Sequence, residues 1–210
     1  MEVVESNLKK EQLELVYDGM AKGMTYEEYR DKVHHLAEND QTTGLVQSEA
    51  NINYTHLSDR RMNRWDKTLK IPAELQEKVA GGQSKLGFLV LTESWCGDAA
   101  PSLPVVNKVA ELNPNIDLRI VIRDENPELM DAFLTNGTRS IPKLIILDKE
   151  KEEIVGEWGP RPTIATQMVE DQKREHGKLT AEFKQDLQMW YNKDKGANIL
   201  DDLLKLLPLE

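Results

Sequence analysis

Cysteine is almost absent from this sequence, whose 210 residues include only Cys96. A single cysteine excludes an internal disulfide framework and fits a reducing compartment. Two further features are missing. Residues 1–5 lack the basic and apolar regions of a signal peptide, and no apolar run approaches the ~20 residues that span a membrane. These absences predict a cytoplasmic protein with no membrane segment.

Positive charge is also scarce. The chain has 27 lysine and arginine residues against 37 aspartate and glutamate residues, which gives a net charge of −10. This balance disfavours nucleic-acid binding, because phosphate backbones need clustered cations. One basic cluster surrounds Trp65, and we interpret it as a solvated helix face, the alternative being a surface for an anionic small thiol or a docking partner. Its members are Arg60, Arg61, Arg64 and Lys67.

Residues that commonly bind metals are few and scattered. The four histidines include one adjacent pair, whose side chains would diverge by about 100° on a helix and could not easily grip one ion. We therefore predict no metal site and no resident cofactor. The four are His34, His35, His56 and His176.

The lone cysteine lies between an apolar run and a predicted helix. Phe88 to Thr92 has the length of a strand, and a helix is expected over residues 99–112. At such a junction, unpaired N–H groups and the positive end of the helix dipole lower a thiol pKa and favour the reactive thiolate. The negative charge of Asp98 acts in the opposite direction. Cys96 is thus the predicted reactive residue, the alternative being a buried cysteine that only packs.

Two motifs carry a resemblance to a known family. The first is Trp95-Cys96-Gly97 at the start of a helix, with Pro104 eight residues after the cysteine, and the second is Ile141-Pro142. Together they resemble the thioredoxin superfamily, and within it a bacterial group of proteins with a Trp-Cys-Gly-Asp signature. The resemblance covers residues 84–176. It implies an α/β, thioredoxin-like fold, in which helices flank a central mixed sheet.

The chain departs from this family at two positions. Dithiol thioredoxins have a second cysteine where this chain has Ala99, and many bury an acid where it has Val90. A disulfide therefore cannot form within the motif, and Val90 cannot transfer protons. The resemblance then implies a monothiol protein, in which Cys96 forms a mixed disulfide or a sulfenic acid that an external thiol resolves.

The resemblance also gives roles to residues that would face a substrate. Trp95 offers a flat surface, and Gly97 allows close approach of a partner's backbone. Pro142, which is cis in this family, exposes the backbone of Ile141 for strand-like pairing. Arg139 would lie near enough to stabilise a thiolate or to bind a carboxylate of glutathione, unless it is a solvated loop residue.

The pattern of elements divides the chain into three parts. Residues 1–83 are predicted to be a helical N-terminal extension, residues 84–176 a thioredoxin-like domain, and residues 177–210 a helical C-terminal extension. A capping box at Thr25 begins a helix that ends near Glu38. The apolar helix at 198–207 is expected to pack on the protein's own body or on another subunit. The other predicted helices are 58–69, 128–134, 163–176 and 180–191, and the later strands are 116–122, 143–147 and 153–158.

Two functions are compatible with these features. In the first, the protein is a monothiol thiol–disulfide oxidoreductase or redox sensor, with protein or small-molecule disulfides and thiols, glutathione among them, as partners. In the second, it is a non-catalytic thioredoxin-fold module that holds an extended peptide in a groove between Trp95 and Pro142. An iron–sulfur cluster is less compatible, because Asp98 would repel the cluster's negative charge. The residues alone do not decide between the first two.

Overall fold

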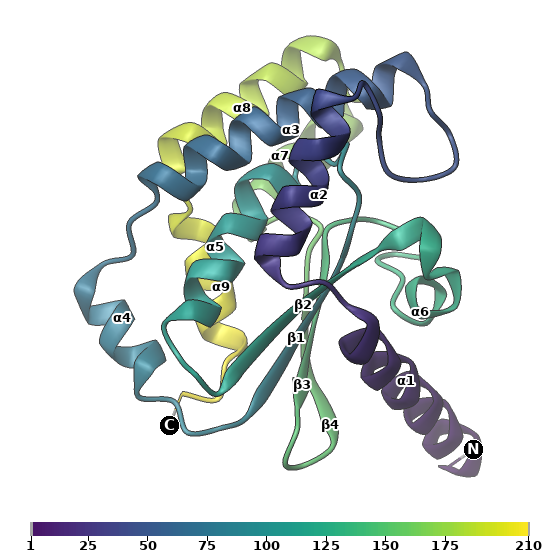
Figure 1. The fold of residues 1–210 in the computed structure, drawn as a ribbon, viewed down its shortest axis with the longest axis vertical. Helices are drawn as coiled ribbons and strands as arrows, with labels where there is room; N and C mark the ends of the chain where they lie inside the picture. Colours follow the sequence, from purple (N-terminus) through teal and green to yellow (C-terminus); the bar gives the residue numbers. More distant parts are fainter. Residues whose placement is uncertain (1, 210) are drawn as a thin grey trace.

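A four-stranded sheet forms the centre of the protein, whose computed structural model describes residues 2–209, with side chains from residue 7 onward (Figure 1). The strand order is β2-β1-β3-β4. Strand β1 (Leu86–Thr92) runs parallel to β2 (Ile116–Ile122) and antiparallel to β3 (Lys143–Asp148), and β3 pairs antiparallel with β4 (Glu153–Trp158). This mixed sheet, flanked by helices, confirms the predicted α/β fold class and the hairpin of the last two strands.

Helices cover both faces of the sheet. Helices α1 (Glu2–Lys22) and α6 (Pro127–Ala132) lie on one face, and α5 (Ala99–Glu111) and α9 (Ala197–Leu206) lie on the other (Figure 1). The chain also contains α2 (Tyr26–Glu38), α3 (Glu49–Thr68), α4 (Ala73–Ala80), a short 3-10 helix (Arg123–Glu125), α7 (Thr163–His176) and α8 (Ala181–Asp194).

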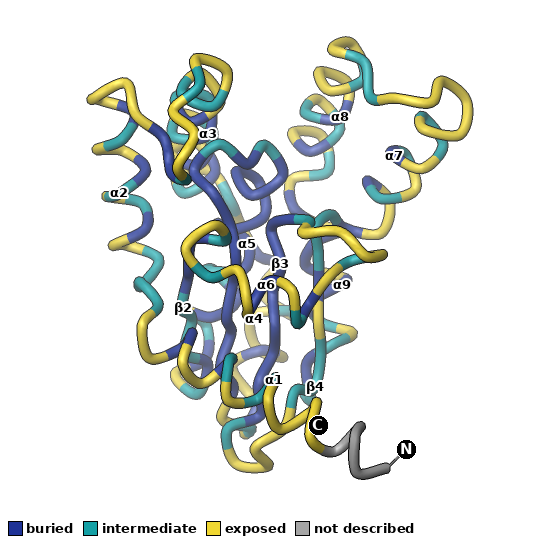
Figure 2. Tube along the Cα trace, turned by 90° about the vertical axis from the view of Figure 1, so that its right-hand side faces the viewer, coloured by how far each residue is buried: buried dark blue, intermediate teal, exposed yellow. Residues whose placement is uncertain are grey.

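The core follows β1, which is buried along its whole length because helices cover both of its faces (Figure 2). The terminal helices belong to the same core: α3 packs against α5, and α9 packs against both α5 and β4. Ile199 and Leu203 of α9 are fully buried. The expectation that this apolar helix packs on the protein's own body is therefore confirmed. The division at residues 83 and 176 stays a prediction.

The start of α2 matches its sequence signal. The Thr25 hydroxyl accepts a hydrogen bond from the backbone N–H of Glu28, and the Glu28 carboxylate accepts one from the N–H of Thr25. This capping box satisfies two N–H groups that the first turn would otherwise leave unpaired. The helix then buries Tyr29, Val33 and Ala37, one turn apart on the face that meets the body.

Helix α3 begins nine residues before the predicted start at Ser58. Ser48 caps it, accepting a hydrogen bond from the N–H of Asn51. The prediction was wrong because the first half of this helix buries polar side chains, Thr55 and Ser58, where an apolar period was expected. Ser48 followed by Glu49 was a usable start signal.

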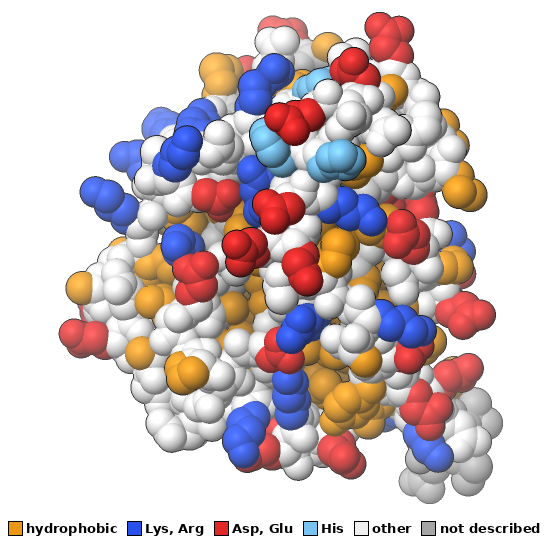
Figure 3. Space-filling view, in the orientation of Figure 1, with side chains coloured by type: hydrophobic (Ala, Val, Ile, Leu, Met, Phe, Trp, Pro, Cys, Tyr) orange, Lys and Arg blue, Asp and Glu red, His pale blue; other side chains and the backbone are white. Residues whose placement is uncertain are grey.

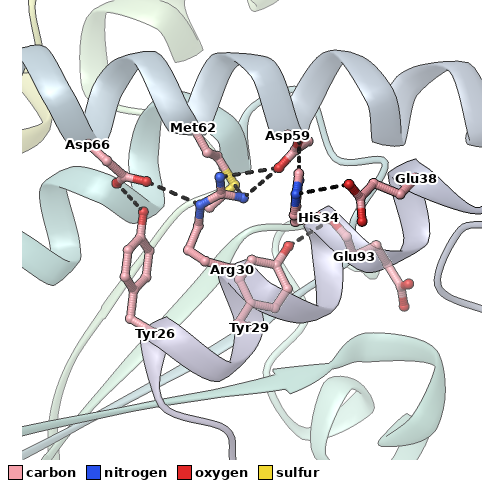
Figure 4. Close-up of polar contacts among 9 residues, drawn as sticks. All are labelled: Tyr26, Tyr29, Arg30, His34, Glu38, Asp59, Met62, Asp66 and Glu93. Carbon is pink, nitrogen blue, oxygen red and sulfur yellow. Dashed lines mark hydrogen bonds and ion pairs between the residues drawn. The ribbon is translucent and has the colours of Figure 1, made fainter.

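An ion-pair network joins α2 to α3 (Figure 4). The Arg30 guanidinium contacts Asp59 at 3.2 Å and Asp66 at 3.1 Å, and these three side chains are mostly shielded from solvent. The Tyr26 hydroxyl donates to Asp66 at 2.6 Å, and His34 lies 3.2 Å from Asp59. One arginine thus neutralises two acids and fixes the two helices to each other.

One group of positively charged side chains stands out on the face of the molecule drawn in Figure 3. Lys and Arg side chains gather at the upper left of Figure 3, where Figure 1 places α3 and α8. Trp65 is buried, whereas Arg60, Arg64 and Lys67 are exposed. These three cations lie on a solvated helix face, as predicted, and the alternative of a surface for an anionic thiol or a docking partner stays a prediction. Among the helices of residues 2–209, none is long and apolar enough to cross a membrane.

Candidate functional site

Cys96 lies in the turn that leads from β1 to the first turn of α5. Its backbone N–H donates to the carbonyl of Glu93 at 3.1 Å, which closes the turn. Its thiol donates to the carbonyl of Ile141 at 3.3 Å, and the backbone N–H groups of Asp98 and Ala99 are directed at the sulfur. The predicted junction of strand, cysteine and helix is therefore present, but Cys96 is only 6% exposed.

Burial reverses the expected direction of the Cys96 pKa. Removal of the sulfur from water, and then the charge of Asp98, raise the pKa of this thiol to about 12. The N–H groups of Ala99 and Asp98 and the charge of Arg161 act against this rise without cancelling it. The lowered pKa expected from the helix N-terminus is therefore wrong for this arrangement, because desolvation outweighs the two N–H groups.

Asp98 holds the other chemically important position in the turn. Its carboxylate forms an ion pair with Arg161 at 2.6 Å and accepts a hydrogen bond from the Tyr191 hydroxyl at 3.2 Å. Burial raises the pKa of Asp98, and Arg161 opposes this rise. Asp98 precedes α5 but makes no side-chain cap for it. It is instead the centre of a buried charged cluster beside the thiol.

Sequence reasoning missed Arg161 and Tyr191. Arg161 follows β4 at the corner Gly159-Pro160-Arg161-Pro162, and Tyr191 lies on α8. The first could have been suspected, because an arginine between two prolines at the end of a strand is held in place. The second could not, since nothing in the sequence places α8 over the cysteine turn.

Trp95 and Gly97, the neighbours of Cys96, are both half-buried. The Arg123 guanidinium lies 5.1 Å from the centre of the Trp95 ring, in a cation–π arrangement that covers part of its flat surface. A Cβ atom at Gly97 would meet no other group within 4 Å, so space for an approaching group exists at this point. The Gly97 carbonyl accepts a hydrogen bond from Gln188 of α8 at 3.3 Å.

Arg139 points to a different partner from the predicted one. Its guanidinium forms two hydrogen bonds of 2.6 Å with the carboxylate of Asp131, in the bidentate geometry that suits this pair. Asp131 also raises the pKa of Arg139. The structure therefore gives this exposed arginine the loop role that was the alternative, and it is Arg161 that reaches the turn of Cys96.

Ile141 lies against the thiol, and Pro142 follows it through the cis peptide bond that the family motif predicts. Both are buried, the peptide bond between them is cis, and the Ile141 carbonyl accepts the thiol's hydrogen bond. Gly159, at φ +111°, passes so close that a Cβ there would lie 2.1 Å from the Pro142 carbonyl oxygen. Only glycine fits this approach. It brings the end of β4, and with it Arg161, next to the cysteine turn.

Residues of α2, α3 and the loop between them pack behind the cysteine turn and form hydrogen bonds with it. The Tyr29 hydroxyl of α2 donates to the Glu93 carbonyl at 3.3 Å. Ser94 donates its N–H to the Thr43 hydroxyl at 2.8 Å, and its own hydroxyl lies 2.8 Å from that of Thr55 on α3. All of these groups are buried. The N-terminal helices thus fix the backbone that positions Cys96.

Glu93 is a second buried acid close to Cys96. It is fully buried, and its carboxylate accepts hydrogen bonds from the Thr43 hydroxyl and, at 2.9 Å, from the N–H of Asp124. Burial raises its pKa, and both hydrogen bonds oppose that rise. Val90, where many thioredoxins have their buried acid, is itself buried and apolar. Near the cysteine turn, two buried carboxyl groups follow that position, those of Glu93 and Asp98.

Comparisons with known proteins agree with this geometry. The profile of a family described as Thioredoxin matches residues 44–175. A Streptomyces coelicolor protein with the provisional name thioredoxin 2 is 36% identical over 80 residues, which cover 38% of this chain and 57% of that protein. The matched region therefore spans little more than half of that relative's length.

Two solved structures are similar in fold. An HIV epitope scaffold has a TM-score of 0.57 at 18% identity, with 90% of this chain and 95% of that chain covered. A protein of unknown function from Pseudomonas aeruginosa has a TM-score of 0.54 at 21% identity, with 87% and 96% covered. At these identities the two structures support the fold alone.

Proposed function

This chain belongs to the thioredoxin family, and on that premise we propose that it is a monothiol thiol–disulfide oxidoreductase or redox sensor that acts through Cys96. The observation that carries the proposal is the position of the thiol. Cys96 lies against Ile141 at the start of α5, with two backbone N–H groups directed at its sulfur, and the chain has no second cysteine. The sequence Trp95-Cys96-Gly97-Asp98 is the motif on which the proposed activity is centred.

The proposed reaction needs an external thiol. The Cys96 thiolate attacks one sulfur of a disulfide RSSR, the new Cys96–S–S–R bond forms as the old S–S bond breaks, and RS⁻ leaves and takes up a proton. A thiol R′SH, as its thiolate, then attacks the R sulfur of the mixed disulfide, which restores Cys96 and releases RSSR′. Disulfide and thiol are exchanged in equal amounts, so no further oxidant or reductant is required. Ala99 cannot perform the second step.

The neighbours of Cys96 have two roles: some position the disulfide substrate, and others control the ionisation of the thiol. Trp95, Gly97, Ile141 and Pro142 form the surface that we expect a disulfide to meet. Asp98 modulates the thiol: its charge opposes ionisation of Cys96, and Arg161 at 2.6 Å reduces that opposition. Glutathione or another small thiol of the cytoplasm would serve as the resolving partner, with no bound cofactor.

One observation favours a second function. Burial raises the pKa of Cys96 to about 12, and a thiol that stays protonated at neutral pH is a weak nucleophile. A thioredoxin-fold module that binds an extended peptide near Trp95 and Pro142 would need no thiolate. In that case Cys96 would only pack.

Turnover distinguishes the two functions. We expect the protein to accelerate the reduction of hydroxyethyl disulfide by glutathione, and Cys96→Ser to abolish this acceleration while the folded state persists. Cys96→Ala serves as a second variant that cannot form a hydrogen bond to Ile141. If the Cys96→Ser protein and the unchanged protein give the same rate as buffer, the oxidoreductase proposal fails and the binding module becomes the better account.

A further inference from the structure

Helix α8 lies over the turn that contains Cys96, and two of its side chains are hydrogen-bonded to that turn. Gln188 donates to the Gly97 carbonyl at 3.3 Å, and Tyr191 donates to Asp98 at 3.2 Å. These contacts join residues more than 90 positions apart in the sequence, and they are to the two residues that directly follow the cysteine. Any substrate that approaches from this side meets α8 first.

The other sides of the thiol are also occupied. The Ile141 carbonyl, the backbone group expected to pair with an extended peptide, accepts the Cys96 thiol instead, and Ile141 is 8% exposed. Arg123 lies across Trp95 at 5.1 Å. Open space exists beside Gly97, where an added Cβ would meet nothing within 4 Å. The approach to the sulfur is therefore narrow, and α8 forms one of its sides.

Helix α8 buries fewer of its residues than α9 does. Leu187 and Tyr191 are buried and Phe183 and Trp190 pack half-buried against the core, whereas the shorter α9 buries five residues. Backbone turns in left-handed conformation border it on both sides, at Gly177 and at Lys195 and Gly196. A hydrogen bond from Arg64 of α3 to Asn192 of α8 also links the two helices, and this pair is exposed. Segments with few buried contacts open at lower free energy than the core does.

We propose that Gln188 and Tyr191 are specificity-determining residues: by tethering α8 to Gly97 and Asp98, they restrict Cys96 to low-molecular-weight disulfides and exclude folded protein surfaces. This inference rests on the proposed function. Both are positioning residues, since they act through α8 and not on the sulfur. Loosening the two tethers widens the approach and admits larger disulfides.

The test compares two maleimides of different size on the same thiol. The rate constants of Cys96 with N-ethylmaleimide and with a maleimide carried on a 5-kDa polyethylene glycol are measured, and their ratio is divided by the ratio for free glutathione. A change in the thiol pKa alters both rates equally, so the ratio reports access alone. The variants are Gln188→Ala with Tyr191→Phe and, as a matched control, Gln185→Ala at an exposed position of the same helix.

We expect the unchanged protein and Gln185→Ala to react much more slowly with the bulky reagent. The double variant should raise the relative rate of the bulky reagent about tenfold, because two hydrogen bonds of ordinary strength no longer hold the helix. Gln188→Ala alone, at a half-buried position, should shift the ratio in the same direction, and it keeps the test decisive if the double variant unfolds. Far-UV circular dichroism checks that each variant is folded.

Three results would overturn the inference in different ways. The role of α8 in restricting access is refuted if the unchanged protein has the same bulky-to-small rate ratio as glutathione. It is also refuted if both tether variants leave that ratio unchanged. Either result leaves the proposed function intact. In the third result, N-ethylmaleimide does not react with the folded unchanged protein or with either variant but reacts fully in urea. This result refutes both the role of α8 and the proposed function.

Discussion

Two opposite charges beside Cys96, those of Asp98 and Arg161, act on the ionisation of its thiol in addition to burial. The Asp98 carboxylate is the second largest cause of the raised thiol pKa after burial, and Arg161 is a cause that lowers it. The two side chains contact each other at 2.6 Å, so each reduces the effect of the other on the sulfur. Substitution of either one alone should shift the thiol pKa, in opposite directions.

Asp98→Asn should lower the Cys96 pKa, because it removes a negative charge that disfavours the thiolate. Arg161→Met should raise it, because the uncompensated Asp98 charge then acts at full strength. The measurement is the midpoint of alkylation rate against pH, with Asp201→Asn, an exposed position on α9, as the control. Midpoints that move in the same direction in both variants would contradict this electrostatic account.

At the scale of elements, the contacts between α2 and α3 support the backbone that precedes Cys96. Tyr29 on α2 donates to the backbone carbonyl of Glu93, and the Thr55 hydroxyl on α3 contacts the side-chain hydroxyl of Ser94. Arg30 joins the two helices through Asp59 and Asp66. Loss of that arginine would leave two acids without their partner between the helices (Figure 4).

Arg30→Met should destabilise the fold by about 1–3 kcal/mol, less than the loss of a fully buried ion pair, because the network is partly exposed. Urea unfolding at pH 7 measures the free energy of unfolding. Arg60→Met, which removes an exposed arginine of α3, is the matched control and should change it by no more than about 0.5 kcal/mol. Equal losses in both variants would mean that the network contributes nothing.

Elements with a strong local signal could be predicted from the sequence. Helix α7 has the predicted bounds, 163–176, because Pro162 precedes it and Gly177 ends it in left-handed conformation. Strand β2 likewise has its predicted bounds, 116–122. Helix α3 was predicted too short, because its N-terminal half buries hydroxyl groups. The Thr55 hydroxyl is satisfied there by the hydroxyl of Ser94, a partner that only the tertiary fold brings close.

The site residues that are neighbours in the sequence were predicted, and those contributed by distant elements were missed. Cys96, Gly97 and Asp98 are consecutive, so the sequence places them together. Arg161 and Tyr191 come from distant elements, and their position depends on how β4 and α8 pack. The predicted thiol pKa had the wrong direction for the same reason, because burial is a property of the whole fold.

At the scale of the molecule, the C-terminal helix α9 is part of the core. Helix α9 contacts α5 and β4, and it buries Asp202, which accepts hydrogen bonds from Trp158 and Thr163. The strand that precedes Arg161 and the first turn of α7 are thus joined through α9. The position of Arg161 therefore depends on a segment that the family profile, ending at residue 175, does not include.

Leu203→Ala should cost about 2–5 kcal/mol in the free energy of unfolding, because Leu203 is fully buried and its truncation leaves a cavity. Urea unfolding measures the loss. Leu45→Ala, the same substitution at a position that is 97% exposed, is the control and should leave stability almost unchanged. A small cost for Leu203→Ala would mean that α9 is a peripheral appendage and not part of the core.

Thiol–disulfide exchange at Cys96 is tested most directly by trapping the mixed disulfide. The folded protein is incubated with oxidised glutathione, quenched in acid, and analysed by intact mass and peptide mapping. We expect one glutathione adduct, located on Cys96, that an added small thiol removes, and no adduct on Cys96→Ser. No adduct on the folded protein, with ready formation after unfolding in urea, would contradict it and would identify Cys96 as a packing residue.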